Sequence, residues 1–162
     1  MSKLATSQKI KPFLWFDGQA EKAMEFYTAI FPNSQITTLK RWGKGSDFPA
    51  EWVMNGSMIL DGLQIHAFDA GPQFKFTEAI SFFVSCEDQE EVNHYWNALT
   101  AGGKEEPCGW LKDQFGLSWQ IVPKMLGERL QNGDPARVGK MMQALMQMKK
   151  LEIADLEAAY AG

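Results

Sequence analysis

The chain has 162 residues, of which 45% are hydrophobic and 22% charged, and its formal net charge is −4. These values are ordinary for a globular protein, and the length allows one domain with a sizeable core. The acidic total argues against a nucleic-acid partner, because such a partner requires a basic face.

Membrane and export signals are not expected. The apolar runs are shorter than the roughly 18 residues of a membrane span, and residues 1–11 are polar where a signal peptide needs an apolar core. The two cysteines, Cys86 and Cys108, have no CxxC spacing and imply no disulfide framework. We therefore expect a cytoplasmic protein without a membrane partner.

The first predicted elements are a strand and a helix. The apolar, aromatic run Ile10–Phe16 predicts the strand, and Asp17 suits the N-cap of the helix. Six apolar residues follow at the spacing of one helical face and end at Phe31, where Pro32 and Asn33 stop the helix.

Three strands are predicted next. Residues 35–42 alternate like a strand and are followed by a glycine-rich loop at 43–49. Residues 51–60 and 63–68 predict a hairpin around Asp61-Gly62, a dipeptide typical of a type I′ turn.

The second half repeats this order after a linker at 69–76. Ala79–Ser85 predicts a strand, and Asp88 with Glu91 three residues later resembles a capping box at the start of a helix. That helix ends before the Gly102-Gly103 pair. A short strand and loop at 104–110 and a last strand at 117–122 complete the half.

Helices are predicted from Met125 to the end of the chain. Pro123 breaks the strand pattern, and Asp134-Pro135 starts a helix with an apolar stripe of Val138, Met141, Met142, Leu145 and Met148. Methionine fills irregular gaps in cores. We expect this stripe to pack against the sheet or a second subunit; a ligand-binding stripe is the alternative.

The repeat allows positions in the two halves to be compared. We call the first strand of each half its entry strand and the last its closing strand. Pairing Gly62 with Gly116 makes His66 equivalent to Gln120 on the closing strands. Pairing Phe13 with Phe82 places the equivalent entry-strand positions within about one residue of Pro12 and Ser81.

Three segments of the sequence stand out, namely Cys108–Pro123, His66–Pro72 and Ala79–Phe82. They resemble sequences of the glyoxalase or vicinal-oxygen-chelate superfamily, and within it those of the PhnB-like branch. Proteins of this branch are often labelled 3-demethylubiquinone 3-methyltransferases. The sequence shows neither a strand followed by a GxGxG-type loop nor a Rossmann-like alternation, so we infer no methyl transfer from the residues.

The resemblance implies an α+β fold of two βαβββ-type units around a cavity. We place the paired domain at residues 1–123, with units at about 10–70 and 78–123, and treat 124–162 as a helical extension that is not an independent domain. Members of the superfamily commonly pair, so we expect a homodimer.

Metal-dependent members usually take one ligand from each entry strand and one from each closing strand. Here those positions hold proline, Ser81, His66 and Gln120. Divalent metals prefer imidazole, carboxylate or thiolate, and only His66 is such a ligand. We expect no metal cofactor; a relaxed site of His66, Gln120 and water or substrate oxygens is the alternative.

The candidate catalytic residues are His66, as a general acid or base, and Gln120, whose amide can donate and accept. Both also fit a purely structural role. The candidate ligand-binding residues are Trp42, Ser81, Cys108, Trp110 and Trp119. Core packing explains Trp119 equally well, and a reactive Cys108 requires a nearby base or cation.

Two functions from different classes remain. The first is an enzyme acting on a small organic molecule at His66 and Gln120. The alternative is a non-enzymatic protein that sequesters a small molecule in an aromatic cavity, which the six Trp and eleven Phe residues favour. An interaction module is a third, weaker option. Superfamily membership leaves the substrate open.

Overall fold

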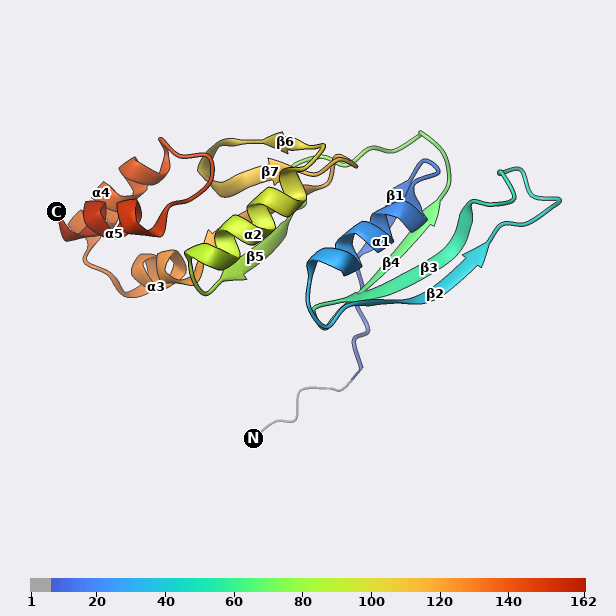
Figure 1. Cartoon of the computed structure of the whole chain (residues 1–162), viewed down its shortest axis with the longest axis horizontal. Coiled ribbons are helices and arrows are strands. Elements are labelled where there is room, and N and C mark those ends of the chain that lie inside the picture. The colour runs from blue at the N-terminus through green and yellow to red at the C-terminus, as the bar shows by residue number, and fades with distance from the viewer. Residues whose placement is uncertain (1–6) are drawn as a thin grey trace. The chain divides into compact units, whose positions relative to one another are not determined.

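The computed structural model describes residues 7–162 and forms two compact units, one ending at Lys75 and the other running from Phe76 to Gly162. The expectation that residues 1–11 contain no signal peptide falls partly on residues 1–6, which lie outside the described range. Each unit contains a four-stranded sheet and a helix that crosses one face of it (Figure 1).

Unit 1 has the order strand, helix and three strands that the sequence predicts. The elements are β1 (Phe13–Phe16), α1 (Ala20–Ile30), β2 (Gln35–Arg41), β3 (Val53–Leu60) and β4 (Leu63–Asp69). The strands lie in the order β1-β4-β3-β2, with β1 parallel to β4 and the other neighbours antiparallel. The predicted hairpin turn is confirmed, because Asp61 and Gly62 both have positive φ.

The two faces of this sheet differ in composition. Ile65 and Ala67 of β4 are fully buried and share their face with α1, while Gln64, His66 and Phe68 alternate with them on the other side. We call this second side the helix-free face of unit 1. The period of two therefore separates a packed core from a row of side chains that reach solvent.

Asp69, at the end of β4, ties the unit together. Its carboxylate is 2% exposed and accepts hydrogen bonds from the backbone N–H of Ala20 at 3.0 Å and of Val53 at 2.9 Å. The start of α1 is thus satisfied by a residue distant in sequence. The prediction that Asp17 caps this helix is wrong: the N-cap is Gln19, which makes no side-chain cap.

Unit 2 repeats the arrangement and then adds helices. Its elements are β5 (Phe82–Cys86), α2 (Gln89–Thr100), β6 (Lys104–Glu105), a 3₁₀ turn (Pro107–Gly109), β7 (Trp110–Lys112), β8 (Ser118–Pro123), α3 (Lys124–Asn132), α4 (Pro135–Leu145) and α5 (Ile153–Ala161). The strand order is β5-β8-β7-β6, with β5 parallel to β8. Asp88 caps α2 as predicted, accepting from the N–H of Glu91 at 2.9 Å.

The methionine stripe lies inside unit 2. Met141 is fully buried and Leu145 nearly so, in a cluster with Val122 of β8 and Leu156 and Tyr160 of α5. Val138, Met142 and Met148 pack against the same cluster. The stripe therefore packs within this chain, against β8 and α5, as one of the predicted arrangements has it, and not against a second subunit.

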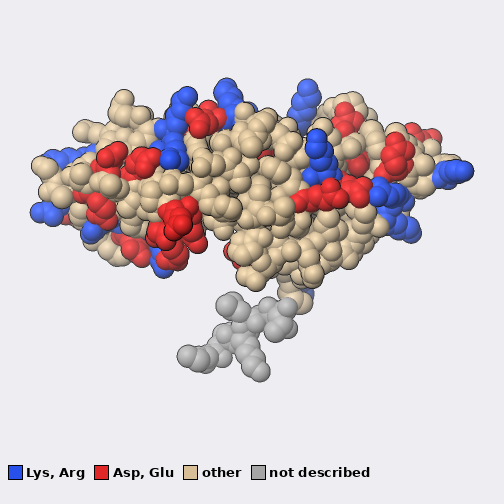
Figure 2. All heavy atoms as spheres, in the orientation of Figure 1, with Lys and Arg blue, Asp and Glu red and all other residues tan. Residues whose placement is uncertain are grey.

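No helix within residues 7–162 combines the length and apolar character needed to cross a bilayer. On the face drawn in Figure 2, basic and acidic side chains are interspersed over both units.

Replacement of Asp69 should lower the stability of the protein far more than replacement of Asp17. Asp69→Ala leaves two backbone N–H groups at a buried site without their charged acceptor, and we expect it to lower the free energy of unfolding by about 3 kcal/mol. Asp17→Ala, at an exposed position, should change it by less than about 0.5 kcal/mol. Urea unfolding followed by circular dichroism measures both, and equal effects would contradict the role given to Asp69.

Candidate functional site

A row of three side chains crosses the sheet of unit 1 at His66. Residue His66 of β4 is in register with Phe13 of the parallel strand β1 and with Ser57 of the antiparallel strand β3. All three lie on the helix-free face, because their neighbours in sequence are the residues buried against α1. The imidazole therefore sits between a phenyl ring and a hydroxyl group.

Aromatic contacts hold the orientation of the imidazole. The ring of Phe13 stacks on that of His66 with centroids 5.9 Å apart and planes 3° from parallel. Phe13 in turn meets Phe68 edge to face at 4.9 Å, and Phe68 meets Trp15 in the same way. Phe13 is nevertheless 59% exposed, so this aromatic group is accessible as well as ordered.

A pocket of about 290 Å³ opens beside His66 on the β3 side. Its lining consists of Lys11, Thr37, Ser57, Met58, Ile59, Gln64 and His66. The hydroxyl oxygens of Thr37 and Ser57 lie 2.7 Å apart and share one hydrogen bond. The pocket therefore combines an imidazole, an ammonium group, a hydroxyl pair and an amide over an apolar floor.

Sequence reasoning found only His66 among these residues. Ser57 and Gln64 carry a weak signal, because each is a polar residue that alternates with buried ones along a predicted strand. Lys11 and Thr37 carry none. Lys11 precedes β1, and its place at the pocket follows from the path of the chain beside β4.

The corresponding row in unit 2 contains Phe83, Gln120 and Trp110, which are paired across β5, β8 and β7. Gln120 donates from Nε2 to Oγ of Ser81 at 2.9 Å. Two of the predicted site residues are thus in direct contact, and a third, Trp110, is the strand neighbour of Gln120. The structure places His66 in unit 1 and this group in unit 2.

The predicted equivalence of Phe13 with Phe82 is off by one residue. Phe13 pairs with His66, whereas the partner of Gln120 is Phe83, and both phenylalanines are similarly exposed, at 59% and 60%. Phe82 lies on the other side of its strand and meets Trp119 edge to face. The entry-strand position of unit 1 is therefore Phe13, within one residue of Pro12 as predicted, and that of unit 2 is Phe83, two residues after Ser81.

This register tests the metal site that the repeat suggests. The four equivalent positions carry two phenyl rings, one imidazole and one amide, at Phe13, Phe83, His66 and Gln120. Within residues 7–162, no three His, Cys, Asp or Glu side chains lie close enough together to hold a metal ion. A divalent metal needs several imidazole, carboxylate or thiolate ligands, which neither the phenyl and imidazole pair of unit 1 nor the phenyl and amide pair of unit 2 supplies.

Two predicted ligand-binding tryptophans make structural contacts. Trp119 is 2% exposed and donates from Nε1 to the buried carboxylate of Asp113 at 2.9 Å, so its indole packs in the core and the prediction that it contacts a ligand is wrong. Trp42 is half-buried, donates to the carbonyl oxygen of Asp69 at 2.8 Å and packs on Phe48. Its indole N–H is therefore used to fix the loop after β2.

Cys108 lies beside the C-terminal helices. Its backbone is in the left-handed region at φ 64°, and its N–H donates to the carbonyl of Met148 at 2.8 Å. The side chain is half-buried against the apolar cluster of unit 2. Cys86 is fully buried, and that burial, followed by the charges of Glu91 and Asp88, raises the pKa of its thiol to about 12.

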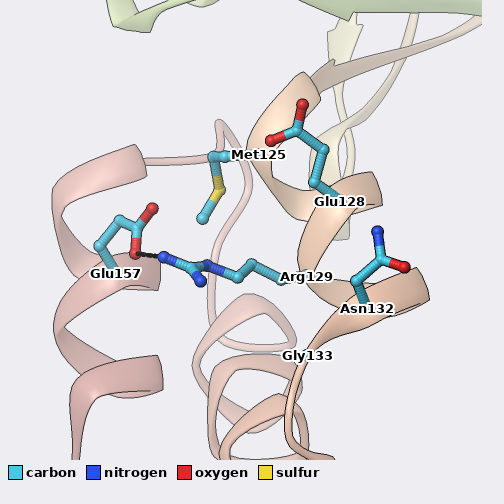
Figure 3. Close-up of a pocket in the computed structure, with 6 residues that line it drawn as sticks. All are labelled: Met125, Glu128, Arg129, Asn132, Gly133 and Glu157. Carbon is cyan, nitrogen blue, oxygen red and sulfur yellow. Dashed lines mark hydrogen bonds and ion pairs between the residues drawn. The ribbon is translucent and has the colours of Figure 1, made fainter.

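A second pocket, of about 450 Å³, lies among the C-terminal helices (Figure 3). Arg129 reaches across it from α3 to pair with Glu157 of α5 at 3.2 Å, and its guanidinium lies 4.3 Å from the ring centroid of Tyr160. The charge of Arg129 is thus already balanced within the protein. Because its central cation is engaged, this pocket is a weaker candidate than the one at His66.

Solved structures with the same architecture define the class of protein. The PhnB protein from Bacillus cereus is 33% identical, with 72% of this chain and 99% of that chain covered and a TM-score of 0.67. Protein PA1353 from Pseudomonas aeruginosa is 19% identical, with 73% and 98% covered and a TM-score of 0.62. The fosfomycin resistance protein FosX from Listeria monocytogenes is 17% identical, with 78% and 98% covered and a TM-score of 0.54. The fold is that of the glyoxalase or vicinal-oxygen-chelate superfamily.

The family follows from the sequence match. Residues 8–122 match the family described as 3-demethylubiquinone-9 3-methyltransferase. With this match and its identity to the Bacillus cereus protein, the chain belongs to that family, the PhnB-like branch of the superfamily. Comparison with curated proteins gives no match. The resemblance stated from the sequence is confirmed, as is the α+β fold with its C-terminal helices.

The environments of the two cysteines predict different reactivities. A thiol reagent acts on the thiolate, which Cys86 forms only near pH 12. We expect one thiol of the folded chain to react with Ellman's reagent at mildly alkaline pH, and both after unfolding. Cys108→Ser should remove the reaction of the folded protein, whereas its survival in that variant would show that Cys86 is accessible.

Proposed function

We propose that this chain is an enzyme that acts on a small organic molecule at the pocket of unit 1, with His66 exchanging a proton with the substrate. The supporting observation is the position of His66, half-buried in a small pocket and stacked on Phe13. Of the ionisable side chains, imidazole is the one whose ordinary pKa suits both donation and acceptance of a proton near neutral pH.

The neighbouring groups suit this role. Stacking on Phe13 sets the plane of the imidazole ring beside the pocket. The hydroxyl groups of Thr37 and Ser57 form a short hydrogen-bonded pair at the same pocket and offer both a donor and an acceptor. A substrate oxygen bound there would lie within reach of groups that orient it. Holding reacting groups in a productive geometry contributes substantially to enzymatic rate enhancement.

In unit 2 we propose a ligand-contacting role for Gln120, Ser81 and Trp110. The Gln120–Ser81 contact leaves the amide oxygen of Gln120 available as an acceptor.

The proposed reaction uses no metal, because the side chains at Phe13, His66, Phe83 and Gln120 are not the ligands that a divalent metal needs. Methyl transfer is not part of the proposal either, since within residues 7–162 the connections from β1 to α1 and from β5 to α2 are not glycine-rich loops of the type that holds such cofactors.

We also propose that the protein is a homodimer in the cytoplasm. The methionine stripe no longer supports the dimer, because it packs within unit 2. Any contact between subunits would have to use another surface.

The two histidines of the chain provide a matched test of the catalytic role. The purified protein would be incubated with a panel of small organic acids, esters and epoxides, and products detected by mass spectrometry. We expect His66→Asn to lower kcat/KM for any converted compound by about 10²-fold or more, the usual contribution of a general acid or base.

His94→Asn is the control, because His94 is exposed on α2 and belongs to neither row. It should leave the rate unchanged. Full turnover by a folded His66→Asn protein would overturn the catalytic role. Tight binding of a compound with no product would instead favour the sequestering function.

A further inference from the structure

The pocket at His66 has an unbalanced charge. Its ionisable lining residues are Lys11 and His66, and none of the seven lining residues is an aspartate or a glutamate. None of the ion pairs formed within residues 7–162 involves Lys11. The ammonium group is therefore available to a ligand, in contrast to Arg129 in the second pocket.

The position of Lys11 is fixed by its flanking residues. Gln8 acts like a strand neighbour of Gln64: its side chain accepts from the Gln64 N–H at 2.9 Å and donates to the Gln64 carbonyl at 3.0 Å. On the other side of Lys11, the carbonyl of Pro12 accepts from the N–H of His66 at 2.9 Å. Residues 8–12 are thereby held along β4, which brings Lys11 to the pocket mouth.

The hydroxyl pair adds a free donor. Thr37 and Ser57 share a single hydrogen bond, so one hydroxyl group donates to the other and the second retains a proton to donate elsewhere. The amide of Gln64 supplies further N–H donors to the same lining. The lining thus offers several hydrogen-bond donors and no carboxylate.

We infer that this pocket binds the oxyanion group of the ligand, a phosphate, phosphonate or carboxylate, with Lys11 as the charged contact and the free hydroxyl proton of the Thr37–Ser57 pair as a neutral donor. The inference rests on the proposed function and narrows its substrate to small anionic molecules. A volume of about 290 Å³ equals that of about ten waters, enough for such a group and a short carbon chain. Charge-assisted hydrogen bonds to an oxyanion are among the stronger polar contacts in proteins.

The test uses inorganic phosphate and acetate as probes and follows the imidazole C–H resonances of the full chain by NMR. The chain has two histidines, so His94 reports nonspecific ion effects while His66 reports the pocket. We expect a saturable shift of the His66 resonance with a much smaller change at His94. Saturation by phosphate alone would identify a tetrahedral group, and saturation by acetate a carboxylate.

Lys11→Gln should weaken the binding of the probe about tenfold, the loss of one charge-assisted hydrogen bond. Lys22→Gln is the matched control, since it removes the same charge from an exposed position on α1. Absence of a saturable shift with either ion, or equal binding by the Lys11→Gln protein, would overturn the inference.

Failure of the inference is distinguishable from failure of the proposed function. If neither ion binds and an uncharged substrate is converted in a reaction that depends on His66, the oxyanion site is contradicted and the catalytic role is supported. Saturable phosphate binding together with full turnover by His66→Asn would support the oxyanion site and contradict the catalytic role of His66.

Discussion

The buried carboxylate of Asp69 is the interaction on which the arrangement of unit 1 depends. It receives backbone N–H groups from the first turn of α1 and from the first residue of β3, while its own strand, β4, pairs with both β1 and β3. A charged group is stable in such a place only when its oxygens are hydrogen-bonded. The end of β4 is therefore fixed against the neighbouring elements of the unit.

The position of His66 follows from that anchor. His66 lies three residues before Asp69 on the same strand, and the pleat turns the two side chains to opposite faces. The anchored face becomes the packed core, and the other face presents Phe13, His66 and Ser57 in one row. A shift of one residue in register would bury the imidazole and expose Ile65 or Ala67, which the apolar core opposes.

The repeat relates the candidate residues of unit 1 to those of unit 2. In both units a phenylalanine of the entry strand pairs with a polar residue of the closing strand, His66 in one and Gln120 in the other. The scaffold thus retains matched positions, while the residues at those positions offer aromatic contact and hydrogen bonding in place of a ligand cage. Fold and chemistry are specified by different residues of the same strands.

The order of the elements follows from local patterns in the sequence, because strand alternation, helical spacing and the Asp61-Gly62 turn act over a few residues. The start of α1 does not follow from them, since the acceptor at its first turn is Asp69, 49 residues away from Ala20. The equivalence of Phe13 with Phe83, in place of Phe82, does not follow from the sequence, because a repeat does not fix the register of a parallel pair of strands. Nor does the sequence decide between ligand contact and core packing for Trp119, because its N–H partner, Asp113, lies outside any local pattern.

The pocket beside His66 also could not be predicted from local sequence patterns. Lys11, Thr37 and Ser57 come from three segments that the fold brings together, and no local pattern links them.

We propose that the protein binds small molecules on the helix-free face of unit 1 around His66. Backbone amide NMR spectra of the labelled chain, recorded with a mixture of small metabolites, test this site directly. We expect the largest changes in chemical shift on β3 and β4 around Ser57 and His66. Changes confined to the pocket between α3 and α5 would contradict it.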